Sequence, residues 1–163
     1  MNKSDCIFCK IVSGDAPAHV IWSSDSHMAF LSIFPNTDGF TVVIPKEHHG
    51  SYAFEQSDEV LSELVIVTKT VAKIIDNYYK DVSRTGMFFE GFGVDHLHSK
   101  LFPMHGTGDL EQWKNIESSS NSQFFPTYPG FLPSNDSNRA NDDDLSKLAS
   151  NIRASYQDGN HQV

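Results

Sequence analysis

The stretch H-L-H-S-K-L-F-P, residues 96–103, decides how the rest of the chain is interpreted. Apolar and polar residues alternate along it, which predicts a β-strand over 94–102 that Pro103 closes. Successive side chains of a strand point to opposite faces. We therefore expect the two leucines of the stretch to face the core and three nitrogen-bearing side chains to line an open surface on the other face. These are His96, His98 and Lys100.

Four further segments predict strands, because they are short, rich in β-branched and aromatic residues and bounded by turn sequences such as S-D-S-H and P-N-T-D-G. They are residues 19–24 (HVIWSS), 28–33 (MAFLSI), 40–45 (FTVVIP) and 86–91 (GMFFEG). The first three predict a meander of antiparallel strands.

One long helix is predicted from Ser57 to Tyr78. Apolar residues recur there at spacings of three and four, and Asp58 and Glu59 stand where a helix N-terminus favours negative charge. A run of strands, one long helix and then two further strands predict an α+β fold.

The composition narrows the classes of partner. A length of 163 residues suits one domain with an extension. The hydrophobic fraction of 39% is typical of a globular protein. Twelve basic against 21 acidic residues give a formal charge of −9, which argues against a polynucleotide partner. The sequence contains no apolar run of the kind found in a signal peptide or a membrane span, so we expect a soluble, cytoplasmic protein without a membrane partner.

The sequence changes character after Gly106. We predict a domain over 1–106 and a C-terminal extension over 107–163 that packs on the domain or on a partner subunit. Within the extension, residues 142–156 (DDDLSKLASNIRASY) predict a short amphipathic helix with an acidic first turn.

Several motifs, taken in order, resemble the histidine triad (HIT) family of nucleotide-binding hydrolases and transferases. They are C-I-F-C-K-I (6–11), A-F-L-S-I-F-P (29–35), V-V-I-P-K-E-H (42–48), the long helix, and H-L-H (96–98) ahead of a proline. The resemblance runs from Cys6 to Pro103. It implies a five-stranded antiparallel sheet with one long helix, and a homodimer.

The same resemblance implies that His98 is a nucleophile. It would attack the α-phosphorus of a small nucleotide substrate, a dinucleoside polyphosphate or a nucleoside phosphoramidate, and form a covalent nucleotidyl-histidine that water resolves. An imidazole suits this role because its neutral form is abundant near pH 7. The resemblance also implies that a main-chain carbonyl, here that of His96, fixes the tautomer.

Lys100 departs from the family pattern, which has a third histidine there. Its ammonium can neutralise a phosphoryl oxygen, but lysine is a weaker acid than imidazolium. His105 is a candidate substitute acid. The departure keeps two alternatives open beside a hydrolase: a nucleotidyltransferase or phosphorylase whose acceptor is not water, and a noncatalytic, zinc-stabilised nucleotide-binding protein.

A substrate pocket is also implied by the resemblance. Ser32 stands where the family has an acidic residue that binds ribose, and the apolar members match the family's base pocket, although ordinary core residues would look the same in sequence. The set is Ile7, Phe8, Ile11, Ser32 and Ile33.

Cys6 and Cys9 are the only cysteines, and they are too close together for a useful disulfide framework. Such a pair indicates a metal site or a redox pair. The resemblance implies a structural Zn²⁺ held by Cys6, Cys9, His48 and His96, with His49 as the rival of His48.

Overall fold

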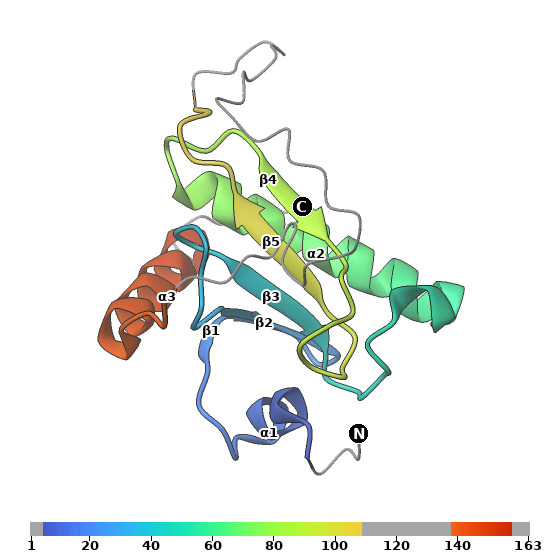
Figure 1. Cartoon of the computed structure of the whole chain (residues 1–163). Coiled ribbons are helices and arrows are strands. Elements are labelled where there is room, and N and C mark those ends of the chain that lie inside the picture. Colours follow the sequence, from blue (N-terminus) through green and yellow to red (C-terminus); the bar gives the residue numbers. More distant parts are fainter. Residues whose placement is uncertain (1–4, 109–137, 158–163) are drawn as a thin grey trace, which may run out of the picture.

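The structure, a computed structural model, describes residues 5–108 and 138–157. Five antiparallel strands form one sheet in the order β1-β2-β3-β5-β4 (Figure 1). This confirms the α+β fold expected from the sequence. The elements are α1 (Ile7–Ser13), β1 (His19–Ser23), β2 (His27–Leu31), β3 (Thr41–Pro45), a 3₁₀ turn (Ala53–Glu55), α2 (Asp58–Tyr78), β4 (Thr85–Phe88), β5 (Ser99–Pro103) and α3 (Asp142–Gln157).

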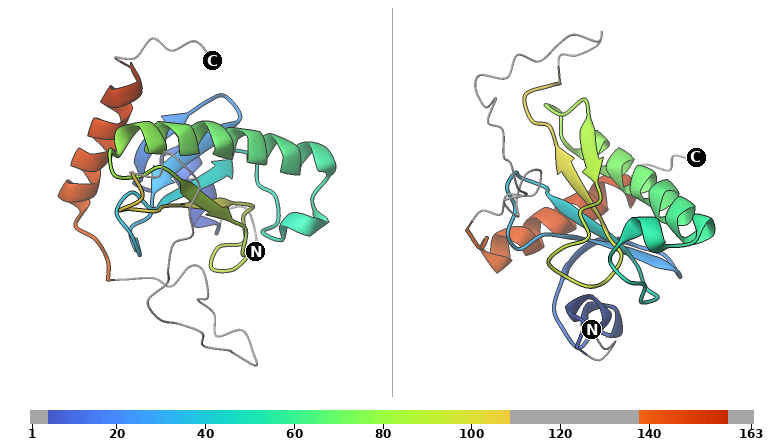
Figure 2. Two further views of the ribbon diagram at one scale, coloured as in Figure 1. Left: turned by 90° about the horizontal axis from the view of Figure 1, so that it is seen from above. Right: turned by 45° about the vertical axis from the view of Figure 1, so that its right-hand side comes forward.

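The long helix α2 begins where the sequence predicted it. The Ser57 side chain accepts a hydrogen bond from the Val60 amide at 3.3 Å, and Asp58 and Glu59 lie in the first turn. The helix lies across one face of the sheet (Figure 2). It buries one stripe of residues there. The stripe consists of Leu64, Thr68, Val71, Ile74 and Ile75.

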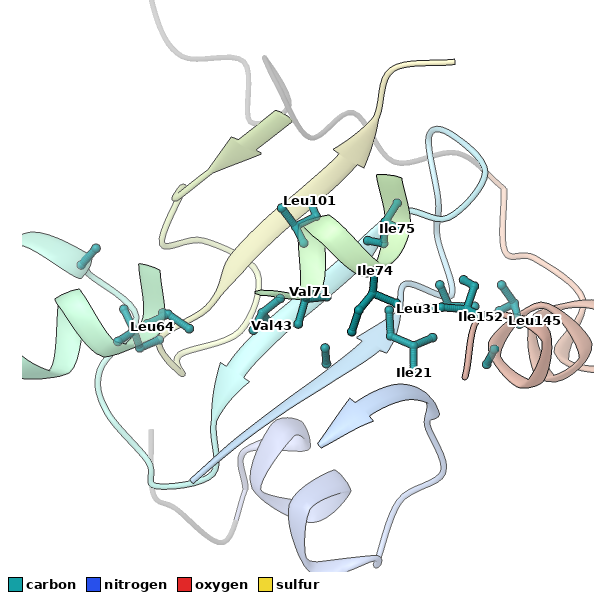
Figure 3. Close-up of a cluster of buried hydrophobic side chains, with 14 residues drawn as sticks. Ile21, Leu31, Val43, Leu64, Val71, Ile74, Ile75, Leu101, Leu145 and Ile152 are labelled. Atoms are coloured by element: carbon teal, nitrogen blue, oxygen red, sulfur yellow. The ribbon is translucent and has the colours of Figure 1, made fainter. Parts of the chain in front are cut away.

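Helices α2 and α3 pack against one face of the sheet. Alternate strand residues on this face, Ala29 and Leu31 of β2 and Val43 of β3, belong to the main hydrophobic core. In Figure 3, Ile152 of α3 lies beside Leu31. Leu101 of β5 is buried in the same core, as its place in the alternation predicted.

The opposite face of the sheet carries α1. Phe30, Val42 and Ile44 alternate with the residues of the main core and form a second buried cluster with Cys6 and Phe8. The short N-terminal helix therefore covers this face of the sheet, on which the candidate site lies.

The predicted strand over 94–102 is shorter than expected, because β5 begins only at Ser99. Gly91 and Gly93 have φ of +73° and +88°, and the His96 amide donates to the Val94 carbonyl at 2.9 Å, so this stretch turns instead of extending. The expected open surface is also wrong, since His96 and His98 are 0% and 3% exposed.

Helix α3 confirms the helix expected near the C-terminus and is fixed to the edge strand β1. Arg153 donates to the Val20 carbonyl, and the Tyr156 hydroxyl donates to the Ile21 carbonyl at 3.0 Å. Residues 109–137, which are about half of the predicted extension, lie outside the described ranges. Within residues 5–108 and 138–157, no helix combines the length and apolar character needed to cross a bilayer.

Candidate functional site

A cavity of about 420 Å³ lies between α1 and the sheet. Its wall includes all five residues expected to bind substrate, together with both expected catalytic residues. They are Ile7, Phe8, Ile11, Ser32, Ile33, His98 and Lys100. Residues from the N-terminal helix, the loop after β2 and the segment around β5 thus meet at one hollow.

His98 is held in one orientation by its own main chain. Its Nδ1 lies 2.7 Å from the His96 carbonyl oxygen. Because a carbonyl only accepts, Nδ1 carries the proton, which leaves Nε2 as the nitrogen available to a substrate. The Phe8 ring packs edge-on at 5.6 Å between centroids. Burial, and then Lys100, lower the pKa of His98, although the bond to His96 opposes this, so the neutral imidazole prevails near pH 7.

Lys100 is paired with a residue that the sequence analysis missed. Its Nζ lies 2.9 Å from the Glu90 carboxylate, and the two side chains are only 16% and 8% exposed. The ammonium also lies 5.6 Å from the centre of the Phe88 ring. One signal was present in the sequence: Glu90 is an acidic residue inside the apolar and glycine-rich run GMFFEGFG.

The structure brings the four expected metal ligands together. One ligand atom from each of Cys6, Cys9, His48 and His96 lies within 4.8 Å of the others. The sulfur–nitrogen separations are 3.5 Å for Cys6 to His96, 3.3 Å for Cys9 to His48 and 3.6 Å for Cys9 to His96. Tetrahedral zinc with ordinary bond lengths separates sulfur and nitrogen ligands by about 3.6 Å. The cluster could therefore hold a tetrahedral metal ion.

His96 is oriented toward this cluster by a second contact. Its Nε2 lies 2.8 Å from the Pro45 carbonyl oxygen, so Nε2 carries the proton and Nδ1 faces the cysteines. Burial lowers the pKa of His96 to about 4, which keeps the ring neutral as a metal ligand requires. The rival residue His49 does not belong to the cluster that the described residues form, and its Nε2 lies 4.0 Å from Glu47.

His105 does not reach the cavity, so the structure does not support it as the substitute acid. Both ring nitrogens are engaged: Nδ1 lies 3.1 Å from Asp81 and Nε2 lies 3.0 Å from the Asp38 carbonyl. Its ring also packs on Tyr79. His105 instead links the loop after α2, at Asp81, to the loop between β2 and β3, at Asp38.

Three further polar residues of the cavity wall were missed by the sequence analysis. His19 begins β1, while Arg139 and Asp142 precede and begin α3. No local motif marks them, because they meet only through packing between segments far apart in the chain.

Comparison with known proteins identifies the family of the chain. The sequence model of the HIT domain matches residues 13–107. An uncharacterised HIT-like protein of Methanocaldococcus jannaschii is 32% identical over 117 residues, which cover 69% of this chain and 90% of that protein. An adenosine 5'-monophosphoramidase of Schizosaccharomyces pombe is 38% identical over 99 residues, which cover 60% and 73%. Among solved structures, a zinc-bound histidine triad family protein of Mycobacterium smegmatis aligns with a TM-score of 0.69 at 22% identity and 96% coverage of both chains. The chain belongs to the HIT domain family, the histidine triad proteins.

Proposed function

We propose that the protein is a nucleotide hydrolase that acts at the α-phosphorus of dinucleoside polyphosphates or nucleoside phosphoramidates. The observation that carries the proposal is the setting of His98. Its Nδ1 is bound to the His96 carbonyl, and the residue lines an apolar cavity beside Lys100. The adenosine 5'-monophosphoramidase among the relatives supports the same class of reaction.

In the proposed first step, the Nε2 lone pair of His98 attacks phosphorus. The new bond joins Nε2 to phosphorus, and the bond from phosphorus to the leaving group breaks. The leaving oxygen or nitrogen takes a proton from Lys100 or from water, while the lysine charge stabilises the phosphoryl oxygens. In the second step water attacks phosphorus, the bond from Nε2 to phosphorus breaks, and His98 is regenerated as the neutral imidazole. The proton of the attacking water passes to solvent, or to Lys100 where the lysine gave up its own proton in the first step.

The apolar wall suits the flat face of a nucleobase. Ile7, Phe8 and Ile11 come from α1, and Ile33 follows β2. Apolar walls with a few placed polar groups are typical of small-molecule sites. The Phe8 ring belongs to this wall and also packs on His98, so it would contact both a bound base and the proposed nucleophile.

We further propose that Cys6, Cys9, His48 and His96 hold a structural Zn²⁺. A closed set of four protein ligands leaves no position for substrate, so the ion would supply stability and no chemistry. The zinc-bound structural neighbour and the ligand separations support this identity. We also infer that residues 1–106 form the catalytic domain, with 107–163 as its extension, in a cytoplasmic homodimer.

Trapping the covalent intermediate tests the proposed mechanism. The protein is incubated with adenosine phosphoramidate or a diadenosine polyphosphate, quenched in base to preserve a phosphohistidine, and its intact mass is measured. We expect one adenylyl group per chain in the wild type and none in His98→Ala, whose turnover should fall by roughly 10⁴-fold or more. His105→Ala is the matched control and should keep both adduct and turnover.

The outcomes separate the alternatives. Wild-type turnover retained by His98→Ala would contradict the mechanism. An adduct that water resolves slowly and inorganic phosphate resolves quickly would favour a phosphorylase, which the replacement of the third histidine by Lys100 makes the second candidate. Nucleotide binding without adduct or product would indicate a noncatalytic binding protein.

A further inference from the structure

We infer that Arg139 and Asp142, at the start of α3, form the part of the cavity that recognises the sugar of the substrate. The remaining acceptor position of the Asp142 carboxylate would accept a hydrogen bond from the 2'- or 3'-hydroxyl of a ribose, and a free N–H of Arg139 would donate to the neighbouring hydroxyl oxygen. The inference rests on the proposed function, since it concerns the same cavity. It extends the active site into the C-terminal segment, beyond residues 13–107 that the family model matches.

The carboxylate is held firmly at the cavity wall. Arg139 donates to it twice, at 2.9 Å from Nη1 and 3.1 Å from Nη2, and His19 Nε2 lies 3.0 Å from the same group. The Ala140 amide donates to the Ile33 carbonyl at 2.9 Å, which ties this segment to the loop after β2. Three hydrogen-bond contacts thus fix the carboxylate beside the pocket, and a fourth hydrogen bond fixes its backbone segment.

Helix α3 makes this position rigid. Leu145, Ala149 and Ile152 are buried in the main core, so the first turn cannot shift without disturbing it. Asn141 accepts from the Asp143 amide at 2.8 Å and caps the helix. Asp142 therefore presents its carboxylate from a fixed backbone, as a specificity contact requires.

Both side chains keep bonding capacity for a ligand. A carboxylate has about four lone-pair positions, of which Arg139 and His19 use three, and a guanidinium has five donors, of which three are used. Asp142 is 57% and Arg139 50% exposed. The bond from Arg139, and then that from His19, lower the pKa of Asp142, so it is ionised near pH 7.

The chemistry of the cavity favours a sugar at this place. Across the described residues, Asp142 supplies the sole carboxylate of the cavity wall. A carboxylate repels phosphate and accepts from hydroxyls, so it would direct the phosphate toward Lys100 and accept from one ribose hydroxyl itself. Ser32, the other oxygen-bearing side chain of this part of the wall, already accepts from the Phe34 amide at 3.1 Å.

Calorimetric binding of two nucleotides tests the inference on the full chain. The probes are AMP and 2',3'-dideoxy-AMP, which differ only in the hydroxyls. We expect the wild type to bind AMP about tenfold or more tightly than the dideoxy form, because charge-assisted hydrogen bonds are lost. In Asp142→Asn this ratio should fall close to one. Asp143→Asn, on the same turn, is the matched control and should keep the wild-type ratio.

The ratio is measured within each variant, so a general loss of folded protein affects both probes alike. A ratio unchanged in Asp142→Asn, or a wild type that binds both probes equally, overturns the inference and leaves the proposed function standing, because AMP still binds. A wild type that binds neither probe and forms no adduct at His98 overturns the proposed function and this inference with it.

Discussion

At the scale of single residues, His96 connects the four candidate metal ligands to His98, the proposed nucleophile. Its Nδ1 points at the cysteines, and its carbonyl accepts from His98 at 2.7 Å. The same residue is anchored through Nε2 to Pro45. Fixing the His96 side chain therefore fixes the carbonyl that selects the His98 tautomer. In the proposed mechanism the cluster would act only by position, since none of its four residues lines the cavity.

The ion pair of Lys100 and Glu90 is the second residue-scale feature, and it leads to a prediction on stability. Lys100→Met leaves the Glu90 carboxylate, 8% exposed, without its lysine counter-charge. Removal of one partner of a buried pair typically costs about 3–5 kcal/mol of unfolding free energy, whereas removal of both can be nearly neutral. We expect Lys100→Met alone to be strongly destabilised and the double variant with Glu90→Gln to recover most of the loss.

Urea unfolding of the wild type, both single variants and the double variant measures this coupling. Additive free energies in the four-protein cycle would show that the pair is not coupled. Activity should behave differently from stability: the double variant regains its fold but stays slow, because the charge beside the phosphoryl group is gone.

At the scale of elements, α1 cannot be stable by itself. Helices shorter than about 12 residues are marginal in water, and α1 has seven. It is held by the buried Phe8, by Cys6 at its N-cap and by Cys9 within it, and Gly14 ends it with φ of +86°. Because α1 also forms one wall of the cavity, we expect its attachment to affect the binding of a nucleotide there.

Cys9→Ser tests this linkage. We expect the variant to lose its zinc, to unfold at least about 5 °C lower, and to bind nucleotide more weakly, since a structural metal contributes folding energy directly. Elemental analysis, calorimetry and hydrogen exchange over α1 measure the three effects. Ser13→Ala on the same helix is the control. A wild type purified without metal that is equally stable with and without added Zn²⁺ would refute the structural role.

At the scale of the whole molecule, alternation was enough to predict which segments contain strands and which of their residues face the main core. The two faces assigned to β5 persist: Ser99 lies 2.6 Å from Thr68 of α2, while Lys100 faces the cavity. The period-two pattern of Phe30 and Val42 against Ala29 and Val43 likewise separates the two cores. Local patterns sufficed here because burial on two sides of a sheet leaves a direct record in sequence.

Contacts between distant segments could not be predicted in this way. The partner of Lys100, Glu90, and the polar end of the cavity at Asp142 depend on how loops and α3 pack. The onset of β5 depends on the two glycines with positive φ that turn the chain ahead of His96. The order of the motifs predicted the residues of the candidate site, whereas tertiary packing determined which residues surround them.

One edge of the molecule suits a second copy of the chain. β4 is an edge strand, and Met87 on it is 44% exposed. Asp76 of α2 accepts from Thr85 of β4 at 2.7 Å, so the helical stripe that contains Asp76 lies along this edge. Val65, on the same stripe by helical spacing, is 37% exposed. Exposed apolar residues beside an open strand edge are typical of pairing surfaces.

Met87→Lys therefore tests the proposed homodimer at this edge. A lysine on an edge strand is charged and strongly hydrated, so pairing with a second sheet would bury its charge at a cost. We expect light scattering after gel filtration to give twice the mass of one chain for the wild type and a single chain for the variant. Thr70→Lys, exposed on α2 away from the Asp76 stripe, adds the same charge and should remain dimeric. A monomeric wild type would exclude the dimer, and a dimeric Met87→Lys would place the interface elsewhere.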